Sequence, residues 1–254
     1  MADYATIKLE LGTIARLWMA RPDKRNPIGP ATCGELVHAL AAIKADASVR
    51  VVVLSGEGVA FSAGGDLAQM AAPTGVPVAS FPDLFHAMHG LGKPIIARVH
   101  GPALAGGLGL MVACDLVVAS DAAVFGTTEI AVGLWPMMIT AELTRSVGRK
   151  KVLEMMLTGA KLTAADALAC GLVNRVVPAD KLDVTVDLLA TELAGRSPAA
   201  VALGLHAFYA AQDMDYSAGL SYLQAELGKV LALEDAAEGI AAFLGKRQPQ
   251  WKGR

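Results

Sequence analysis

Two glycine-rich stretches indicate the fold: Phe61-Ser-Ala-Gly-Gly-Asp66 and Gly101-Pro-Ala-Leu-Ala-Gly-Gly-Leu-Gly109. Each follows an apolar, β-branched run, Val51-Val-Val-Leu54 or Ile95-Ile-Ala-Arg-Val99, and each leads into a stretch typical of a helix. A glycine at a strand-to-helix turn lets the backbone approach a ligand, and the helix start leaves amide N–H groups free. Two such turns on neighbouring strands could direct two amides at one oxygen atom, which would form an oxyanion hole for a carbonyl.

Outward from these turns, the pattern of apolar residues predicts alternating strands and helices, followed by helices alone. The predicted strands are 5–10, 14–19, 51–54, 95–99 and 116–119, and the predicted helices are 30–45, 83–91, 105–113, 138–147, 150–158, 164–170 and 181–194. Three more helices are expected from Ser197 onward, and 72–82, rich in proline and glycine, is predicted to be a mobile loop beside the site. This order predicts an α/β fold with a core over 1–195 and a helical region over 196–254.

The composition excludes several classes of protein. The chain has 254 residues, 54% of them apolar, and a net charge of −2, which argues against nucleic acid as a partner. The most apolar run, 102–114, is too short to span a bilayer, and 1–12 alternates like a strand rather than a signal peptide. Three widely spaced cysteines form neither a zinc pattern nor a disulfide framework, so a cytoplasmic location without membrane contact is expected.

Other site classes do not fit the motifs. The glycine turns lack the third glycine of a dinucleotide fingerprint and the lysine of a phosphate-binding loop, and Ser62 lacks the spacing of a nucleophile elbow. His86 and His89 have no third ligand nearby in sequence, so no metal is predicted. Asp66 is expected to cap a helix and Asp115 to bind local backbone, whereas Glu129 is either a helix cap or a pocket acid or base.

Several blocks of this chain, in order, resemble the crotonase superfamily, that is, enoyl-CoA hydratases and isomerases. They are 61–67, 96–116, 125–130, 157–159, 164–173 and 243–247. The resemblance implies a spiral of ββα units, a helical C-terminal trimerisation region, assembly as a homotrimer or homohexamer, and an acyl-CoA thioester substrate. No separate cofactor is implied, because coenzyme A enters as part of the substrate.

Carried over by position, the resemblance also implies site residues. The amides of Ala63 and Gly106 would hold the thioester oxygen, and Glu129 would transfer a proton. The residues expected to contact coenzyme A are Lys24, Arg25, Ala63, Asp66, Leu67 and Lys246, the last reaching the phosphates of a neighbouring subunit's ligand.

The departures from the family pattern bear on the reaction. Family hydratases use two glutamates; the second matches Glu129, but Gly109 occupies the position of the first, and a glycine cannot move a proton. Met137 and Met138 also stand where hydratases have glycines. A single base favours double-bond isomerisation of an enoyl-CoA. The alternatives are a hydratase that works with one glutamate, a thioester hydrolase or decarboxylase, and a non-catalytic acyl-CoA-binding protein.

Overall fold

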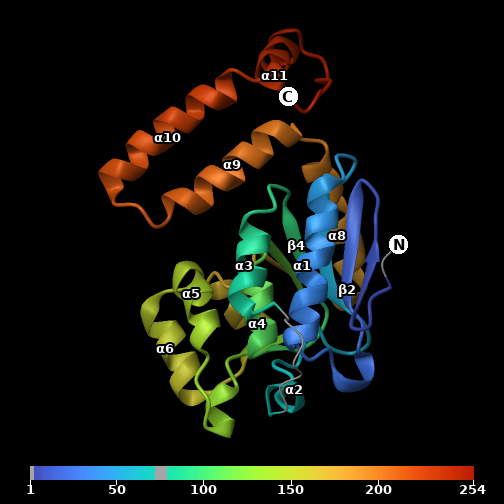
Figure 1. Ribbon diagram of the computed structural model, residues 1–254, viewed down its shortest axis with the longest axis vertical. Coiled ribbons are helices and arrows are strands. Elements are labelled where there is room, and N and C mark those ends of the chain that lie inside the picture. Colours follow the sequence, from blue (N-terminus) through green and yellow to red (C-terminus); the bar gives the residue numbers. More distant parts are fainter. Residues whose placement is uncertain (1–2, 72–78) are drawn as a thin grey trace.

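The computed structural model describes residues 3–71 and 79–254, and over these it forms two sheets surrounded by helices (Figure 1). The larger sheet has the order β1-β2-β3-β4-β6-β9 and the smaller the order β5-β7-β8. The strands are β1 (Ile7–Glu10), β2 (Ile14–Met19), β3 (Val51–Gly56), β4 (Ile95–Val99), β5 (Ala103–Leu104), β6 (Leu116–Ser120), β7 (Val124–Gly126), β8 (Leu162–Thr163) and β9 (Arg175–Val177).

The larger sheet is parallel except for the hairpin of β1 and β2, which forms as predicted. Its central strands β3 and β4 pair in parallel, with Val52 opposite Ile95. Central parallel strands are covered on both faces, which is why Val51–Gly56 is buried along its whole length.

The smaller sheet repeats the order of the larger one. A bridge joins Ser62 to Ala103 in β5, and β5 pairs in parallel with β7. Residues that follow β3, β4 and β6 therefore line up in the same order as those strands. This is the spiral of strand–strand–helix units that the resemblance implies.

Helices cover both faces of the larger sheet. The helices are α1 (Pro30–Ala45), α2 (Leu67–Ala71), α3 (Phe81–His89), α4 (Gly106–Val112), α5 (Met137–Ser146), α6 (Arg149–Thr158), α7 (Ala164–Ala169), α8 (Leu182–Ala194), α9 (Pro198–Ala211), α10 (Tyr216–Leu231) and α11 (Glu234–Leu244). Side chains of α1, α3 and α4 pack with Leu54 and Ile95 in the main core. Alternate strand residues, such as Val53 and Ile96, point to the other face and pack against α8.

The last three helices extend away from the sheet (Figure 1). They form from Ser197 onward, as the sequence predicts, and α9 is anchored to the core because Tyr209 donates a hydrogen bond of 2.6 Å to Asp115. The boundary predicted at 195/196 falls in the turn between α8 and α9; as a division into domains it stays a prediction. Within the described residues, no helix combines the length and the apolar character that a membrane crossing needs.

Several sequence predictions need correction. Strands β5, β7, β8 and β9 lie outside the predicted strands, and β9 pairs with β6 at the edge of the larger sheet. Helix α3 begins at Phe81 rather than Asp83, because Ser80 caps it reciprocally with Asp83. The predicted loop over 72–82 therefore includes the start of a helix, and 72–78 lie outside the described residues.

Candidate active site

The two glycine turns lie against each other, as the sequence predicts. Strands β3 and β4 are neighbours, and beyond them Ser62 N–H donates to Pro102 O at 3.1 Å while Leu104 N–H donates to Ser62 O at 3.0 Å. A Cβ on Gly107 would lie 2.5 Å from Ser62 Cβ, so only a glycine permits this approach.

The second turn presents the amide of Gly106. This residue is the first of α4, where helix geometry leaves an N–H without an intrahelical acceptor. Ala105 before it adopts φ 48° and ψ −127°, a conformation that usually requires glycine, and its own N–H donates to Gly126 O at 2.8 Å. Gly106 N–H has no acceptor among residues 3–71 and 79–254.

The first turn presents the amide of Gly65 rather than that of Ala63. Ala63 N–H donates to Arg25 O at 2.8 Å, which conflicts with its predicted role as an oxyanion donor. In contrast, a parallel bridge sets Ile28 against Gly65: Ile28 N–H donates to Gly64 O, and Asp66 N–H donates to Ile28 O. In such a bridge the central residue points its own N–H away from the partner. Gly65 N–H accordingly has no acceptor in the described part of the chain.

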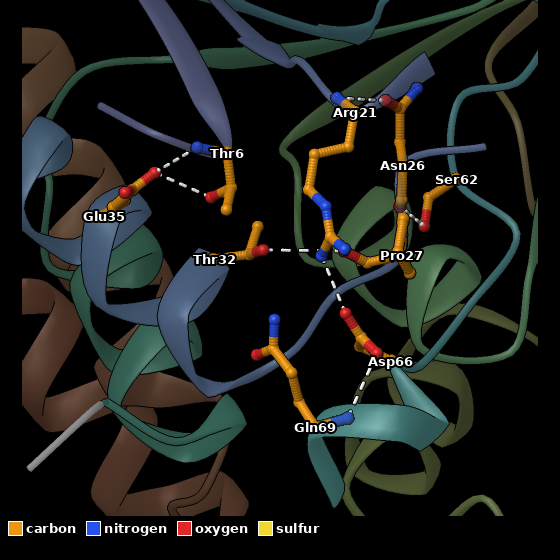
Figure 2. A network of polar contacts seen from close by, with 9 residues as sticks. All are labelled: Thr6, Arg21, Asn26, Pro27, Thr32, Glu35, Ser62, Asp66 and Gln69. Carbon is orange, nitrogen blue, oxygen red and sulfur yellow. Dashed lines mark hydrogen bonds and ion pairs between the residues drawn. The ribbon is translucent and has the colours of Figure 1, made fainter. Parts of the chain in front are cut away.

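A buried side chain, Asn26, holds the first turn in place (Figure 2). Its amide donates to Glu57 O at 2.8 Å and Ala60 O at 2.9 Å, and its Oδ1 accepts from Arg21 N–H. Its carbonyl accepts a 2.7 Å hydrogen bond from Ser62 Oγ. Asn26 is not among the predicted site residues; an asparagine between turn residues in 21–27 is the only signal of it in the sequence.

Asp66 caps α2, as predicted, and also forms a buried ion pair (Figure 2). Its Oδ1 accepts from Gln69 N–H at 3.2 Å, and its Oδ2 lies 2.7 Å from Arg21 Nη1. Burial is the largest single influence and raises the pKa of Asp66, but the hydrogen bond and charge of Arg21 together with the backbone amides of α2 outweigh it, so the pKa is lowered. The carboxylate is thus committed to the fold, and a contact of Asp66 with coenzyme A would have to involve other atoms.

A cavity of about 380 Å³ opens beside the two free amides. Its walls come from both glycine turns, from Phe81 at the start of α3, from the segment after β7 and from the start of α5. The lining residues are Ala63, Gly65, Leu67, Phe81, Ala105, Gly106, Thr128, Glu129, Val132, Leu134, Trp135, Pro136, Met137, Met138 and Ile139. It is a largely apolar chamber with two amide donors and one carboxylate.

That carboxylate belongs to Glu129, which begins a short 3-10 helix after β7. Its Oε2 is buried and has no hydrogen-bond partner among the described residues. Desolvation by burial raises the pKa of Glu129 above its ordinary value. Of the two roles left open by the sequence, the pocket acid or base fits this geometry.

Position 109 has no room for a side chain. A Cβ on Gly109 would overlap Ile139 Cγ2 and lie 2.7 Å from Ile139 Cβ. Gly109 and Ile139 are both buried, so α5 fills the space into which a glutamate at 109 would point.

The remaining predicted contacts of coenzyme A lie in two places. Lys24 and Arg25 are exposed on the loop that is hydrogen-bonded to the first turn, and half of the side chain of Leu67 is exposed at the cavity. Lys246 follows α11, at the opposite end of the molecule from α2 (Figure 1). The structure therefore brings Lys24, Arg25, Ala63, Asp66 and Leu67 together, and Lys246 lies apart from them.

The architecture and this site are those of a crotonase-type enzyme. A sequence model described as "Enoyl-CoA hydratase/isomerase" matches residues 10–254. The 2,3-dehydroadipyl-CoA hydratase of Escherichia coli is 37% identical, with 94% of each chain covered. An enoyl-CoA hydratase structure from Mycobacterium smegmatis has a TM-score of 0.91 at 34% identity, covering 97% of this chain and 99% of its own. Human enoyl-CoA hydratase domain-containing protein 3 has a TM-score of 0.89 at 32% identity, covering 97% and 100%. The chain belongs to the enoyl-CoA hydratase/isomerase family of enzymes.

Proposed function

We propose that this enzyme moves the double bond of an enoyl-CoA thioester, with Glu129 as a single base. The observation that carries the proposal is the filled space at Gly109, because Ile139 occupies the position from which a second catalytic carboxylate would act. Within the described part of the chain, Glu129 Oε2 has no hydrogen-bond partner; the pKa of Glu129 is raised, and it lines the same cavity as Gly65 and Gly106. These features suit a group that takes up a proton and returns it.

The steps follow from the site. The Glu129 carboxylate removes the proton at C2 of a 3-enoyl-CoA, and the electron pair moves onto the thioester oxygen through a conjugated dienolate. The amides of Gly65 and Gly106 donate to that oxygen, and the partial positive charge at the N-terminus of α4 adds to the stabilisation. The protonated Glu129 then delivers the proton to C4, which leaves the conjugated 2-enoyl-CoA and restores the carboxylate.

The substrate is held as a coenzyme A thioester, and no separate cofactor takes part in this scheme. Lys24 and Arg25, exposed beside the first turn, provide cations for the nucleotide end of coenzyme A, and Leu67 lines the cavity. We also propose that the chain assembles as a homotrimer or homohexamer through α9–α11, in which Lys246 reaches a neighbouring site. Exposed apolar residues on α10 and α11, such as Leu227 and Phe243, support that assembly.

Two substrates test the reaction. The purified enzyme is incubated with a 3-enoyl-CoA and with a 2-enoyl-CoA, and double-bond migration and water addition are followed separately. We expect migration that is lost in Glu129→Gln, with slow or undetectable hydration. Rapid hydration that survives Glu129→Gln contradicts the scheme, and tight acyl-CoA binding without turnover identifies a binding protein.

A designed variant tests the space at Gly109 directly. Gly109→Glu combined with Ile139→Gly supplies a second carboxylate and removes both side-chain carbons of Ile139 that a side chain at 109 would meet. We expect this double variant to hydrate a 2-enoyl-CoA faster than Ile139→Gly alone, which is the matched control. Equal hydration by the two variants, with both folded, would show that a second carboxylate at this position is not what limits the reaction.

A further inference from the structure

A second cavity, of about 470 Å³, lies next to the first between α3, α5 and α9. Its walls include Phe85 and His89 of α3, Ala141 and Glu142 of α5, and Tyr209 of α9. None of these residues belongs to the catalytic arrangement described above.

The two cavities share a wall made of Met137 and Met138, at the start of α5. Both side chains are exposed, to 67% and 45%, and a methionine side chain is unbranched and flexible enough to move aside. Along α3, Phe81 lines the first cavity and Phe85, one turn later, lines the second. The two cavities therefore adjoin along α3 and α5, with the two methionines between them.

Several polar groups of the second cavity are paired with one another. His89 Nε2 lies 3.3 Å from Glu142 Oε2, Arg145 Nη2 lies 2.6 Å from Asp213 Oδ1, and the ring of His89 stacks on that of Tyr209 at 4.1 Å. Two carboxylates face this space against one guanidinium, and the other titratable groups of its lining are His86, His89 and Tyr209. An added carboxylate would meet this excess of negative charge, whereas an alkyl chain would contact Phe85 and the methionines.

We propose that the acyl chain of the substrate continues between Met137 and Met138 into this second cavity, so that the enzyme selects medium- to long-chain acyl groups with an uncharged end. The inference rests on the proposed function in one respect, namely that the thioester lies at the Gly65 and Gly106 amides. It extends that function by naming the substrate class.

Binding of saturated thioesters tests this inference without requiring turnover. The affinities of butyryl-, decanoyl- and sebacoyl-CoA are measured by calorimetry; the last has the length of decanoyl-CoA but ends in a carboxylate. We expect decanoyl-CoA to bind at least about tenfold more tightly than butyryl-CoA, because each buried methylene adds affinity, and sebacoyl-CoA to bind more weakly than decanoyl-CoA.

Ala141→Trp fills the second cavity from an exposed position of α5 that lines it, and Thr144→Trp adds the same bulk to α5 outside the cavity. We expect Ala141→Trp to lose most of the preference for decanoyl-CoA while keeping the butyryl-CoA affinity, and Thr144→Trp to resemble the unmodified enzyme. An unchanged decanoyl-CoA affinity in Ala141→Trp overturns the inference, and so does tight binding of sebacoyl-CoA.

The two proposals fail in different ways. A chain-length preference that Ala141→Trp removes, in an enzyme that moves no double bond, supports the second cavity and refutes the proposed reaction. Isomerisation of short and long substrates at equal efficiency supports the reaction and refutes the second cavity.

Discussion

Glu129 combines a raised pKa with an oxygen that has no hydrogen-bond partner in the described residues. We expect Glu129→Gln to lower kcat for isomerisation by roughly 10²–10⁴-fold, the range usual for the loss of a general base. The unmodified enzyme should show kcat/KM rising with pH through an apparent pKa above 4.5, because only the carboxylate accepts the proton. A steady-state pH series measures both effects. A rate that keeps its pH dependence in Glu129→Gln would assign the proton transfer to another group.

The same carboxyl group should cost the fold stability at neutral pH. Because its pKa is raised, the folded chain holds this proton more tightly than the unfolded chain, so the free energy of unfolding falls as pH rises from the unfolded value to the folded value. Glutamine carries no charge, and we expect Glu129→Gln to raise the Tm at pH 7 by a few degrees, about 2–4 °C per kcal/mol for a chain of this size. The difference should vanish below about pH 3, where both states are protonated.

Glu154→Gln is the control for that measurement, since Glu154 is exposed and, among the residues that the structure describes, its carboxylate pairs only with Lys151 on the same helix. Surface pairs of this kind contribute little, so its Tm should stay close to that of the unmodified enzyme. A Tm that falls in Glu129→Gln would mean that the charged carboxylate stabilises the fold.

Ala105 is another single residue where function and stability conflict. Its φ of 48° and ψ of −127° direct the Gly106 amide into the cavity, and such conformations cost an alanine roughly 1–3 kcal/mol. Ala105→Gly should relieve this strain. The gain is reduced by about 0.5–1 kcal/mol, because glycine gives the unfolded chain more backbone entropy. We expect a net gain in the free energy of unfolding, measured with urea, and Ala103→Gly in β5 should lose stability instead. A loss at both positions would show that Ala105 is unstrained.

At the scale of elements, the first glycine turn and the loop before α1 act as one unit because Asn26 joins them. Asn26→Ala leaves buried groups such as Ala60 O without a donor, and it requires an alanine to adopt φ 56°. We expect a loss of roughly 2–3 kcal/mol in the free energy of unfolding and a fall in kcat larger than any change in KM, since the Gly65 amide loses its support.

Asn26→Gly separates the two causes, because glycine adopts a positive φ without strain. It should be less destabilised than Asn26→Ala by about 1 kcal/mol, while its kcat falls as far. If both variants unfold and turn over like the unmodified enzyme, Asn26 does not hold the turn.

Elements with a strong local signal could be predicted from the sequence. Helix α1 has the predicted bounds, Pro30–Ala45, and β4 has the predicted bounds, Ile95–Val99, because a periodic apolar face and a continuous apolar run are local properties. Strand β9 is three residues long and partly exposed, and it forms by pairing with β6, which is distant in sequence.

The site shows the same division. Three features of the site could be predicted because each depends on a sequence motif: the facing glycine turns, the amide of Gly106 and the position of Glu129 in a pocket. The amide donor in the first turn could not be predicted, since whether the amide of Ala63 or of Gly65 is free depends on Arg25 and Ile28.

The partners of Asp115 could not be predicted either, because Asp115 binds Ile95 N–H and Tyr209 rather than only local backbone. The packing of Ile139 against Gly109 likewise joins two segments that are distant in sequence.

At the scale of the whole molecule, the tail presents an apolar surface that the single chain leaves open to water. On α10 the exposed side chains of Leu220, Leu223, Leu227 and Leu231 recur at helical spacing, with exposures of 41–62%. Burying one leucine side chain contributes roughly 1.5–3 kcal/mol, so this stripe can drive the proposed assembly.

We expect sedimentation equilibrium to give the mass of a trimer or hexamer, and Leu223→Lys with Leu227→Lys to reduce it to smaller species. Ser221→Lys with Gln224→Lys is the matched control, since it adds the same charge to exposed polar positions of the same helix.

Lys246 is carried on the same tail, far from the chain's own site, so the disassembled variant should also bind coenzyme A thioesters more weakly. A monomeric unmodified enzyme would refute the assembly. An assembled leucine variant would place the interface elsewhere, and a disassembled variant with unchanged affinity would remove Lys246 from the binding site.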